Sequence, residues 1–139
     1  MPGSSRDWEE YYALRWEILR APWQQPPGSE RDEFEEQARH VLVRGPDRSV
    51  IGVGRWHWRA EQLAQIRYMA VREAFRGRGI ATAVLNHLES GARAAGARHM
   101  TLFARESAAG FYARRGYRSV GPGPTLFGQI THLEMCKAL

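Results

Sequence analysis

The chain has 139 residues, the size of one domain, and its 43% hydrophobic and 25% charged residues are ordinary for a folded protein. Its net charge of +5 comes from 20 basic side chains, of which only Lys137 is a lysine, against 15 acidic ones. The arginines are spread along the chain, which disfavours the long basic stripe of a nucleic-acid-binding module. Arg72, Arg76 and Arg78 nevertheless crowd one segment and favour a local anion site.

Two features of the sequence bear on the cellular compartment. No apolar run approaches the roughly 20 residues that span a membrane, and the opening MPGSSRDWEE lacks the apolar core of a signal peptide. Cys136 is the single cysteine, so no internal disulfide can form. We therefore expect a cytoplasmic protein that has no membrane partner.

The first third of the chain predicts one amphipathic helix and a long connection. Residues 7–20 carry apolar side chains at helical spacing, and Asp7 is suited to cap the helix start. Arg15 falls in the middle of the apolar face, which is unusual for a side chain that is always charged. The proline-rich stretch 21–30 ends the helix. The polar, acidic stretch 30–39 predicts a short helix or a mobile lid.

From residue 40 the hydrophobic period changes and strands alternate with helices. Strands are expected at 40–44, 50–59, 62–71, 98–104, 117–121 and 129–137, and helices at about 80–95 and 106–115. No repeat, linker or low-complexity segment divides the chain. We therefore expect a single α/β domain over residues 1–139, with a mixed sheet covered by helices.

The segment MAVREAFRGRGIA carries the strongest chemical signal. It reads as a strand, a basic turn and the first turn of an apolar helix, whose free N–H groups and dipole favour an anion. Gly77 and Gly79 would let the backbone approach a phosphate, and Arg76 and Arg78 would add charge. The alternative is a helix entry whose arginines face solvent. Thr82 replaces the third glycine of a dinucleotide fingerprint, and the lysine of a P-loop is absent.

Two motifs resemble the GNAT superfamily of acyl-CoA N-acyltransferases. RGRGIA matches the family's pyrophosphate loop, [R/Q]-x-x-G-x-[G/A], and SAAGFYARRGY looks like its A-x-x-[FL]-Y-x-x-x-G-[FY] segment. The closing THLEMCKAL is similar to the final strand, so the resemblance covers roughly residues 40–139. It implies a mixed, mostly antiparallel central sheet with a splayed strand pair, flanked by helices.

The resemblance implies that acetyl-CoA is bound as acyl donor. No metal site is expected, because the histidines lack ligand spacing and the one cysteine is unaccompanied. The main chain of Met69, Ala70 and Val71 would pair with the pantetheine amides, and an N–H near Met69 or Ala70 would polarise the thioester carbonyl. The pyrophosphate would lie on the N–H groups of Arg76, Gly77, Arg78, Gly79, Ile80 and Ala81. Arg105 stands where members often carry asparagine, so it is either a cofactor contact or a solvent-facing helix cap.

The same resemblance implies an N-acetyltransferase that works by direct attack of an amine within a ternary complex. Tyr112 would protonate the leaving thiolate, because a phenol holds its proton at neutral pH; the alternative is a packing residue. His57, His132 and Glu134 are candidates for the general base, and a water chain would serve as well.

The acceptor amine is left open by the sequence. An amino acid, a polyamine, an aminoglycoside and a protein N-terminus all remain, although Arg15 would either bind a substrate carboxylate or extend to solvent. A homodimer through edge strands is a further expectation. A non-catalytic acyl-CoA sensor and, less favoured, a basic nucleic-acid-binding module are the alternatives to an enzyme.

Overall fold

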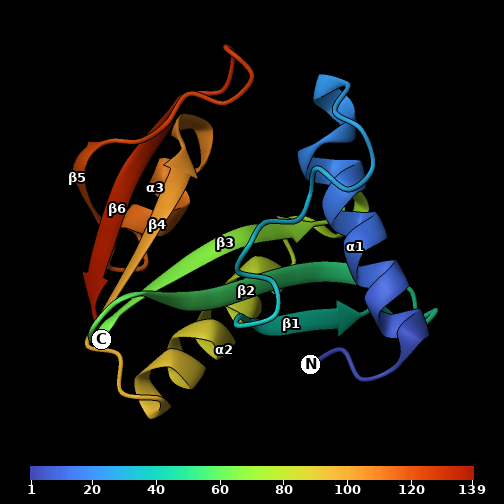
Figure 1. Cartoon of the computed structure of the whole chain (residues 1–139), viewed down its shortest axis with the longest axis horizontal. Coiled ribbons are helices and arrows are strands. Elements are labelled where there is room, and N and C mark those ends of the chain that lie inside the picture. The colour runs from blue at the N-terminus through green and yellow to red at the C-terminus, as the bar shows by residue number, and fades with distance from the viewer.

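The structure, a computed structural model, describes residues 1–139 and consists of one six-stranded sheet with helices on both faces (Figure 1). The strand order is β1-β2-β3-β4-β6-β5, and only β3 and β4 run parallel. The strands are β1 (Arg39–Arg44), β2 (Val50–Ala60), β3 (Leu63–Val71), β4 (His99–Arg105), β5 (Arg118–Pro122) and β6 (His132–Ala138). The predicted fold class is confirmed. No helix is both long and apolar enough to cross a membrane.

Helix α1 (Ser5–Leu19) packs on one face of β2 and β3. Its cap is Ser4 rather than Asp7: the Asp7 amide donates to Ser4 Oγ at 3.1 Å, and the Ser4 amide donates to the Asp7 carboxylate at 3.2 Å. Asp7 thus closes a capping box from the third helical position. The buried side chains Tyr11 and Leu14 pack against Val53 of β2.

Helix α2 (Ile80–Ala94) covers the opposite face of β1, β2 and β3 (Figure 1). Its buried stripe contains Val84, Leu85, Leu88 and Ala92. Close approach depends on Gly54 in β2, where a Cβ atom would lie 2.8 Å from the Val84 side chain. The predicted stripe and strand therefore meet because the strand lacks side chains at the contact.

Two segments differ from the sequence prediction. The helix expected at 106–115 is a 3-10 turn, η3 (Glu106–Ala108), followed by the short α3 (Ala109–Ala113). Residues 30–38 form turns rather than a helix, because their acidic side chains bind buried arginines. Asp32 receives two 2.7 Å hydrogen bonds from Arg55, and Glu35 receives one of 2.7 Å from Arg15. The remaining 3-10 turns are η1 (Ala21–Trp23) and η2 (Glu73–Phe75).

The parallel pair β3–β4 opens along its length. Its register joins only Leu63–Ile66 of β3 to His99–Leu102 of β4. Beyond that point β3 continues towards α1 and β4 towards β6, so the two strands diverge as arms of a V (Figure 1). The edge of β3 at residues 67–71 and the edge of β4 at residues 103–105 therefore face each other without pairing.

Candidate active site

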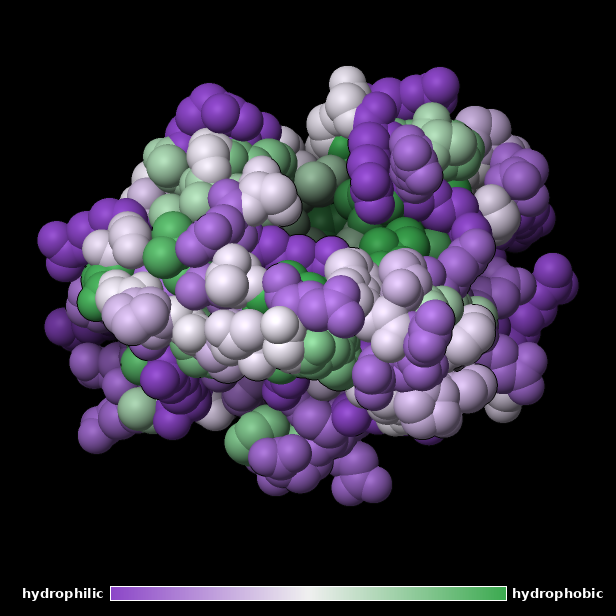
Figure 2. All heavy atoms as spheres, turned by 90° about the horizontal axis from the view of Figure 1, so that it is seen from above, coloured by the Kyte–Doolittle hydropathy of each residue, from purple (hydrophilic) through white to green (hydrophobic).

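A cavity of about 600 Å³ fills the opening between β3 and β4. Most of its lining is hydrophobic, and it extends from the end of α1 past both strands to the start of α2 and to α3. Figure 2 shows the molecule hollowed on this side, with hydrophobic side chains at the floor and polar ones around the rim. Such a shape excludes water from a ligand's apolar part while it leaves the ends open to solvent.

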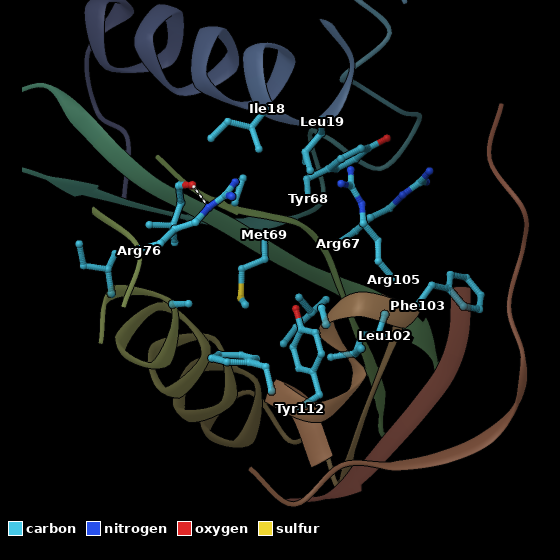
Figure 3. Close-up of a pocket in the computed structure, with 18 of the residues that line it drawn as sticks. Ile18, Leu19, Arg67, Tyr68, Met69, Arg76, Leu102, Phe103, Arg105 and Tyr112 are labelled. Carbon is cyan, nitrogen blue, oxygen red and sulfur yellow. Dashed lines mark hydrogen bonds between the residues drawn. The ribbon is translucent and has the colours of Figure 1, made fainter. Parts of the chain in front are cut away.

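One wall of the cavity is the bulged end of β3. Val53 pairs with Ala70 and Arg55 pairs with Arg67, so both Tyr68 and Met69 stand opposite Gly54. Tyr68 takes the extra turn with a φ of +57°, which a bulky side chain rarely adopts. The bulge directs Met69 into the cavity (Figure 3). Met69, Ala70 and Val71, predicted to hold pantetheine, all line the cavity.

The loop before α2 presents an uninterrupted run of free amides. None of the backbone N–H groups from Gly77 to Thr82 donates a hydrogen bond within the chain. Gly77 and Gly79 have φ values of +76° and +80°, which leave the backbone uncovered by side chains. Six such donors at a helix start suit an anion such as a diphosphate.

Of the two predicted loop arginines, only Arg76 lines the cavity. Its Nε atom donates to the Val71 carbonyl at 3.3 Å (Figure 3). Arg78 lies over the ring of Phe75, 5.2 Å from its centroid, and does not line the cavity. The backbone of Gly79, Ile80 and Ala81 borders the cavity as expected.

Tyr112 enters the cavity from α3. Its ring packs edge-on against Phe111 and Tyr117, with centroid distances of 5.1 Å and 5.7 Å. Figure 3 shows its hydroxyl pointing into the cavity on the side of Met69, and it makes no hydrogen bond within the protein. Burial raises the pKa of Tyr112 to about 12, so the phenol is fully protonated at neutral pH.

A buried ion pair holds the ring on which Tyr112 rests. The Tyr117 hydroxyl donates to Glu89 of α2 at 2.7 Å, and Lys137 Nζ lies 3.0 Å from the same carboxylate. Both the carboxylate and the burial raise the pKa of Tyr117 far above its usual value. Tyr117 is thereby fixed as a neutral, hydrogen-bonded floor beneath Tyr112.

His132, at the start of β6, also lines the cavity. Its Nδ1 atom lies 2.9 Å from the Pro124 carbonyl and 3.1 Å from the Ile130 carbonyl. Since both partners can only accept, Nδ1 carries a proton, and in the neutral ring Nε2 is the nitrogen left to accept one. The structure thus brings the phenol of Tyr112 and the imidazole of His132 to one cavity.

Comparison with known proteins agrees with this geometry. Residues 8–117 match the family described as the Acetyltransferase (GNAT) family. The chain belongs to the GNAT acetyltransferase family. An uncharacterised N-acetyltransferase of Bacillus subtilis (strain 168), YjcF, is 28% identical over 129 residues, which cover 93% of this chain and 91% of that protein.

Solved GNAT structures superpose over nearly the whole chain. A putative N-acetyltransferase from Lactobacillus plantarum is 25% identical, with a TM-score of 0.83 over 98% of this chain and 93% of that one. An aminoglycoside 6'-N-acetyltransferase complexed with coenzyme A is 16% identical, with a TM-score of 0.81 over 97% and 92% of the two chains. The second similarity shows a shared fold.

His57 is not brought to the GNAT cavity. It is 4% exposed and stacks on Phe34 with a centroid distance of 4.4 Å. Burial, and then the charge of Arg55, lower the pKa of His57. A neutral ring sealed beneath Phe34 has no route to an amine in the cavity, so the geometry does not support its role as general base.

Arg15 also lies outside the cavity, contrary to the expected contact with a substrate carboxylate. Its side chain has no exposed surface and donates to Glu35 at 2.7 Å, to the Glu30 carbonyl at 2.9 Å and to the Tyr11 hydroxyl at 2.9 Å. The acidic stretch that follows α1 supplies these partners. Arg15 therefore joins α1 to this stretch rather than to a ligand.

Arg105, by contrast, lines the cavity and lies over the ring of Trp23, 4.6 Å from its centroid.

Several further lining residues were not predicted from the sequence: Arg20, Arg67, Tyr68, Arg115, Pro124 and Leu126. Arg115 was predictable, because it lies three residues after Tyr112 in a predicted helix and so shares its face. Its guanidinium reaches Thr82 Oγ1 at 2.7 Å, in the first turn of α2. No cluster of three His, Cys, Asp or Glu side chains suits a metal ion.

Proposed function

We propose that this GNAT protein transfers an acetyl group from acetyl-CoA to an amine by direct attack within a ternary complex. The observation that best supports this proposal is one continuous cavity. It joins the free amides of residues 77–82, the open edge of β3 and the hydroxyl of Tyr112. The residues present fit coenzyme A. Acetyl-CoA supplies the thioester; the chain supplies the binding and the proton transfers.

The pyrophosphate end is assigned to the loop and α2. The amides from Gly77 to Thr82 donate to phosphate oxygens, and the dipole of α2 favours the negative charge. Arg76 and Arg115 border this end and add positive charge. Anchoring a remote, non-reacting part of the donor in this way fixes the reacting end in place.

The reacting end is assigned to the bulge of β3. The edge of β3 that faces β4 has no ladder partner from Arg67 onward, so amides there are available to a pantetheine chain. The N–H of Met69 or Ala70 would donate to the thioester oxygen and stabilise the negative charge that develops on it during attack. This preorganised donor costs no reorganisation when the reaction occurs.

Two side chains are assigned to proton transfer. Nε2 of His132 accepts a proton from the incoming ammonium, which makes the amine nucleophilic, and Tyr112 protonates the sulfur as the C–S bond breaks. The phenolate then takes the second proton from the nitrogen of the new amide. Glu134 is a weaker candidate for the base, since it pairs with Arg59 at 2.9 Å and does not line the cavity. Cys136 does not line the cavity either, so a covalent acetyl-enzyme has no support.

A non-catalytic acyl-CoA sensor is the second candidate. It would need the phosphate site but neither Tyr112 nor His132, and the presence of both in the cavity favours the enzyme. We place the reaction in the cytoplasm as part of this proposal, on the single unpaired Cys136.

The deciding experiment is thiol release from acetyl-CoA with a panel of amines, comparing Tyr112→Phe with the parent protein. Loss of the phenol should lower kcat about 10²- to 10⁴-fold, the usual contribution of a positioned acid. Affinity for acetyl-CoA should barely change, because the lost interaction forms mainly in the transition state.

Tyr12→Phe is the matched control. The Tyr12 hydroxyl donates to Glu35, and neither residue lines the cavity. The parent rate should also persist to pH 10, because the pKa of Tyr112 is raised to about 12. A Tyr112→Phe enzyme that keeps near-normal turnover would return Tyr112 to a packing role. CoA binding without transfer to any amine would favour the sensor.

A further inference from the structure

The charged side chains that line the cavity are all basic. Its lining includes five arginines and one histidine but neither an aspartate nor a glutamate. The arginines are Arg20, Arg67, Arg76, Arg105 and Arg115. Such a surface attracts anions and repels polycations, because no carboxylate lines the cavity beside the guanidinium groups.

Two of these arginines belong to the phosphate end. Arg76 lies in the loop itself and bonds the Val71 carbonyl, and Arg115 bonds Thr82 in the first turn of α2. The phosphates of coenzyme A account for their positions. They leave three arginines whose charge the donor does not explain.

The other three gather around aromatic rings at the opposite end. Arg67 and Arg20 lie 4.6 Å and 5.4 Å from the centroid of Tyr68, and Arg105 lies 4.6 Å from that of Trp23. Trp23 stacks on Phe127, which Arg20 also covers at 5.4 Å. In Figure 3, Arg67, Arg105 and Tyr68 lie on the opposite side of Met69 from Arg76.

Arg105 is the member of this group that lacks a partner. Arg67 is paired with Asp32 at 2.8 Å, and Arg20 donates to the carbonyls of Ser29 and Leu19 at 2.9 Å each. The Arg105 guanidinium makes no hydrogen bond or ion pair within the chain, although burial and the neighbouring Arg20 and Arg76 lower its pKa. An arginine remains protonated in proteins, so an unpaired charge stands at this end of the cavity.

We infer that the acceptor amine carries an anionic group, a carboxylate or a phosphate, which binds Arg105 with support from Arg20, while Tyr68 borders its carbon skeleton. This inference rests on the proposed acetyl transfer. The planar guanidinium suits two parallel hydrogen bonds to a carboxylate or phosphate. With the anion held there, the amine at the other end of the molecule points towards Tyr112 and His132. Polyamines and aminoglycosides, which bring several positive charges, are disfavoured.

The test compares acids with their neutral counterparts as acceptors. The panel contains α-, β- and γ-amino acids with their primary amides, phosphoethanolamine with ethanolamine, and spermidine. Thiol release from acetyl-CoA gives kcat/KM for each. We expect an anionic member to exceed its neutral counterpart at least about tenfold, as a charge-assisted hydrogen bond allows. The amino-acid and phosphate arms distinguish the two sources of the anion.

The Arg105→Gln variant then identifies the group responsible. It should raise KM for the anionic acceptor about 10- to 100-fold and leave kcat, and the KM of the neutral counterpart, within about twofold. Because the comparison is between enzymes, differences in amine basicity cancel. Arg105→Lys should restore part of the loss. Arg93→Gln, on the exposed end of α2, is the control that should change nothing.

Two results would overturn the inference: neutral amines or spermidine as the better acceptors, or an equal loss on acids and amides in Arg105→Gln. If no amine is acetylated, calorimetric titration of the anionic amines into the CoA complex decides, and absence of binding there also overturns it. Failure of the proposed function itself gives a different result. Either CoA does not bind, or anionic amines bind to the CoA complex but none of the amines is acetylated.

Discussion

Substitution of Gly79 by alanine separates the role of the loop from its conformation. Gly79 has a φ of +80°, and a Cβ atom built there meets nothing within 4 Å. Holding alanine in this left-handed region costs about 1–2 kcal/mol, which for a domain of this size lowers Tm by roughly 3 to 10 °C. The fold should therefore survive, and any further loss should appear only when a ligand approaches the loop.

Gly96 provides a matched control at the other end of α2. Its φ is +106°, a Cβ atom there also meets nothing within 4 Å, and it does not line the cavity. Gly96→Ala should carry a similar loss of stability. Only Gly79→Ala places a methyl group against the run of free amides, so only this variant should lose affinity for CoA. The loss of one or two charge-assisted bonds predicts a Kd about 10- to 100-fold higher.

Calorimetric titration with CoA measures the two affinities directly, and thermal unfolding checks them. CoA at 100 times its Kd should stabilise the parent and Gly96→Ala by about 2.7 kcal/mol, whereas a 100-fold weaker Kd leaves about 0.4 kcal/mol. A Gly79→Ala variant that binds CoA as tightly as the parent would refute the assignment of the diphosphate to residues 77–82. Equal losses of affinity in the two variants would mean that strain, rather than blocked amides, weakens binding.

Three further predictions follow from the same geometry. Arg76→Ala should weaken CoA binding more at low salt than at high salt, because salt screens partly exposed charges. Arg78→Ala should have a smaller effect, because Arg78 does not line the cavity. Titrations with CoA at two ionic strengths test both expectations. Arg15→Met should destabilise the fold by about 3 kcal/mol, since it leaves a buried carboxylate without one of its partners, whereas Arg6→Met, whose side chain is 84% exposed, should change little in urea unfolding. Burial lowers the pKa of His57 and His40 below the unfolded value near 6.5. As the pH falls through that value, the unfolded chain binds protons at these histidines more readily than the folded chain does. The free energy of unfolding should therefore fall as the pH drops from 7 towards 5, and less steeply in His57→Gln.

Local patterns in the sequence predicted most of the elements. Period-two strands and the α2 stripe are local signals, and each predicted strand lies within two or three residues of its observed bounds. The helix expected at 106–115 was too long, because Gly116, with a φ of +94°, marks a turn that begins at Arg114. The acidic stretch after α1 gave no structural signal of its own, since its conformation depends on arginines from other elements.

The candidate site was predictable where it rests on backbone and motif. Gly77, Gly79 and Tyr112 belong to short sequence patterns that predicted them as site residues, and all three line the cavity. The proposed acceptor end was not predictable, because Arg20, Tyr68 and Arg105 come from three separate segments that only the fold brings together. Arg15 shows the converse error: it was expected to bind a substrate carboxylate or to extend to solvent, but it is buried against Glu35, a partner that the sequence alone did not name.

The ion pair of Lys137 with Glu89 has a consequence for the protein's own chemistry. Thioesters acylate unprotonated amines, and guanidinium groups do not lose their protons near neutral pH. A chain whose basic residues are arginines, with one lysine held 3.0 Å from a buried carboxylate, offers almost no primary amine besides its N-terminus. It should therefore acetylate itself on few amines, and stable label on the protein after incubation with an acetyl donor would report the N-terminus, Lys137 or the free thiol of Cys136.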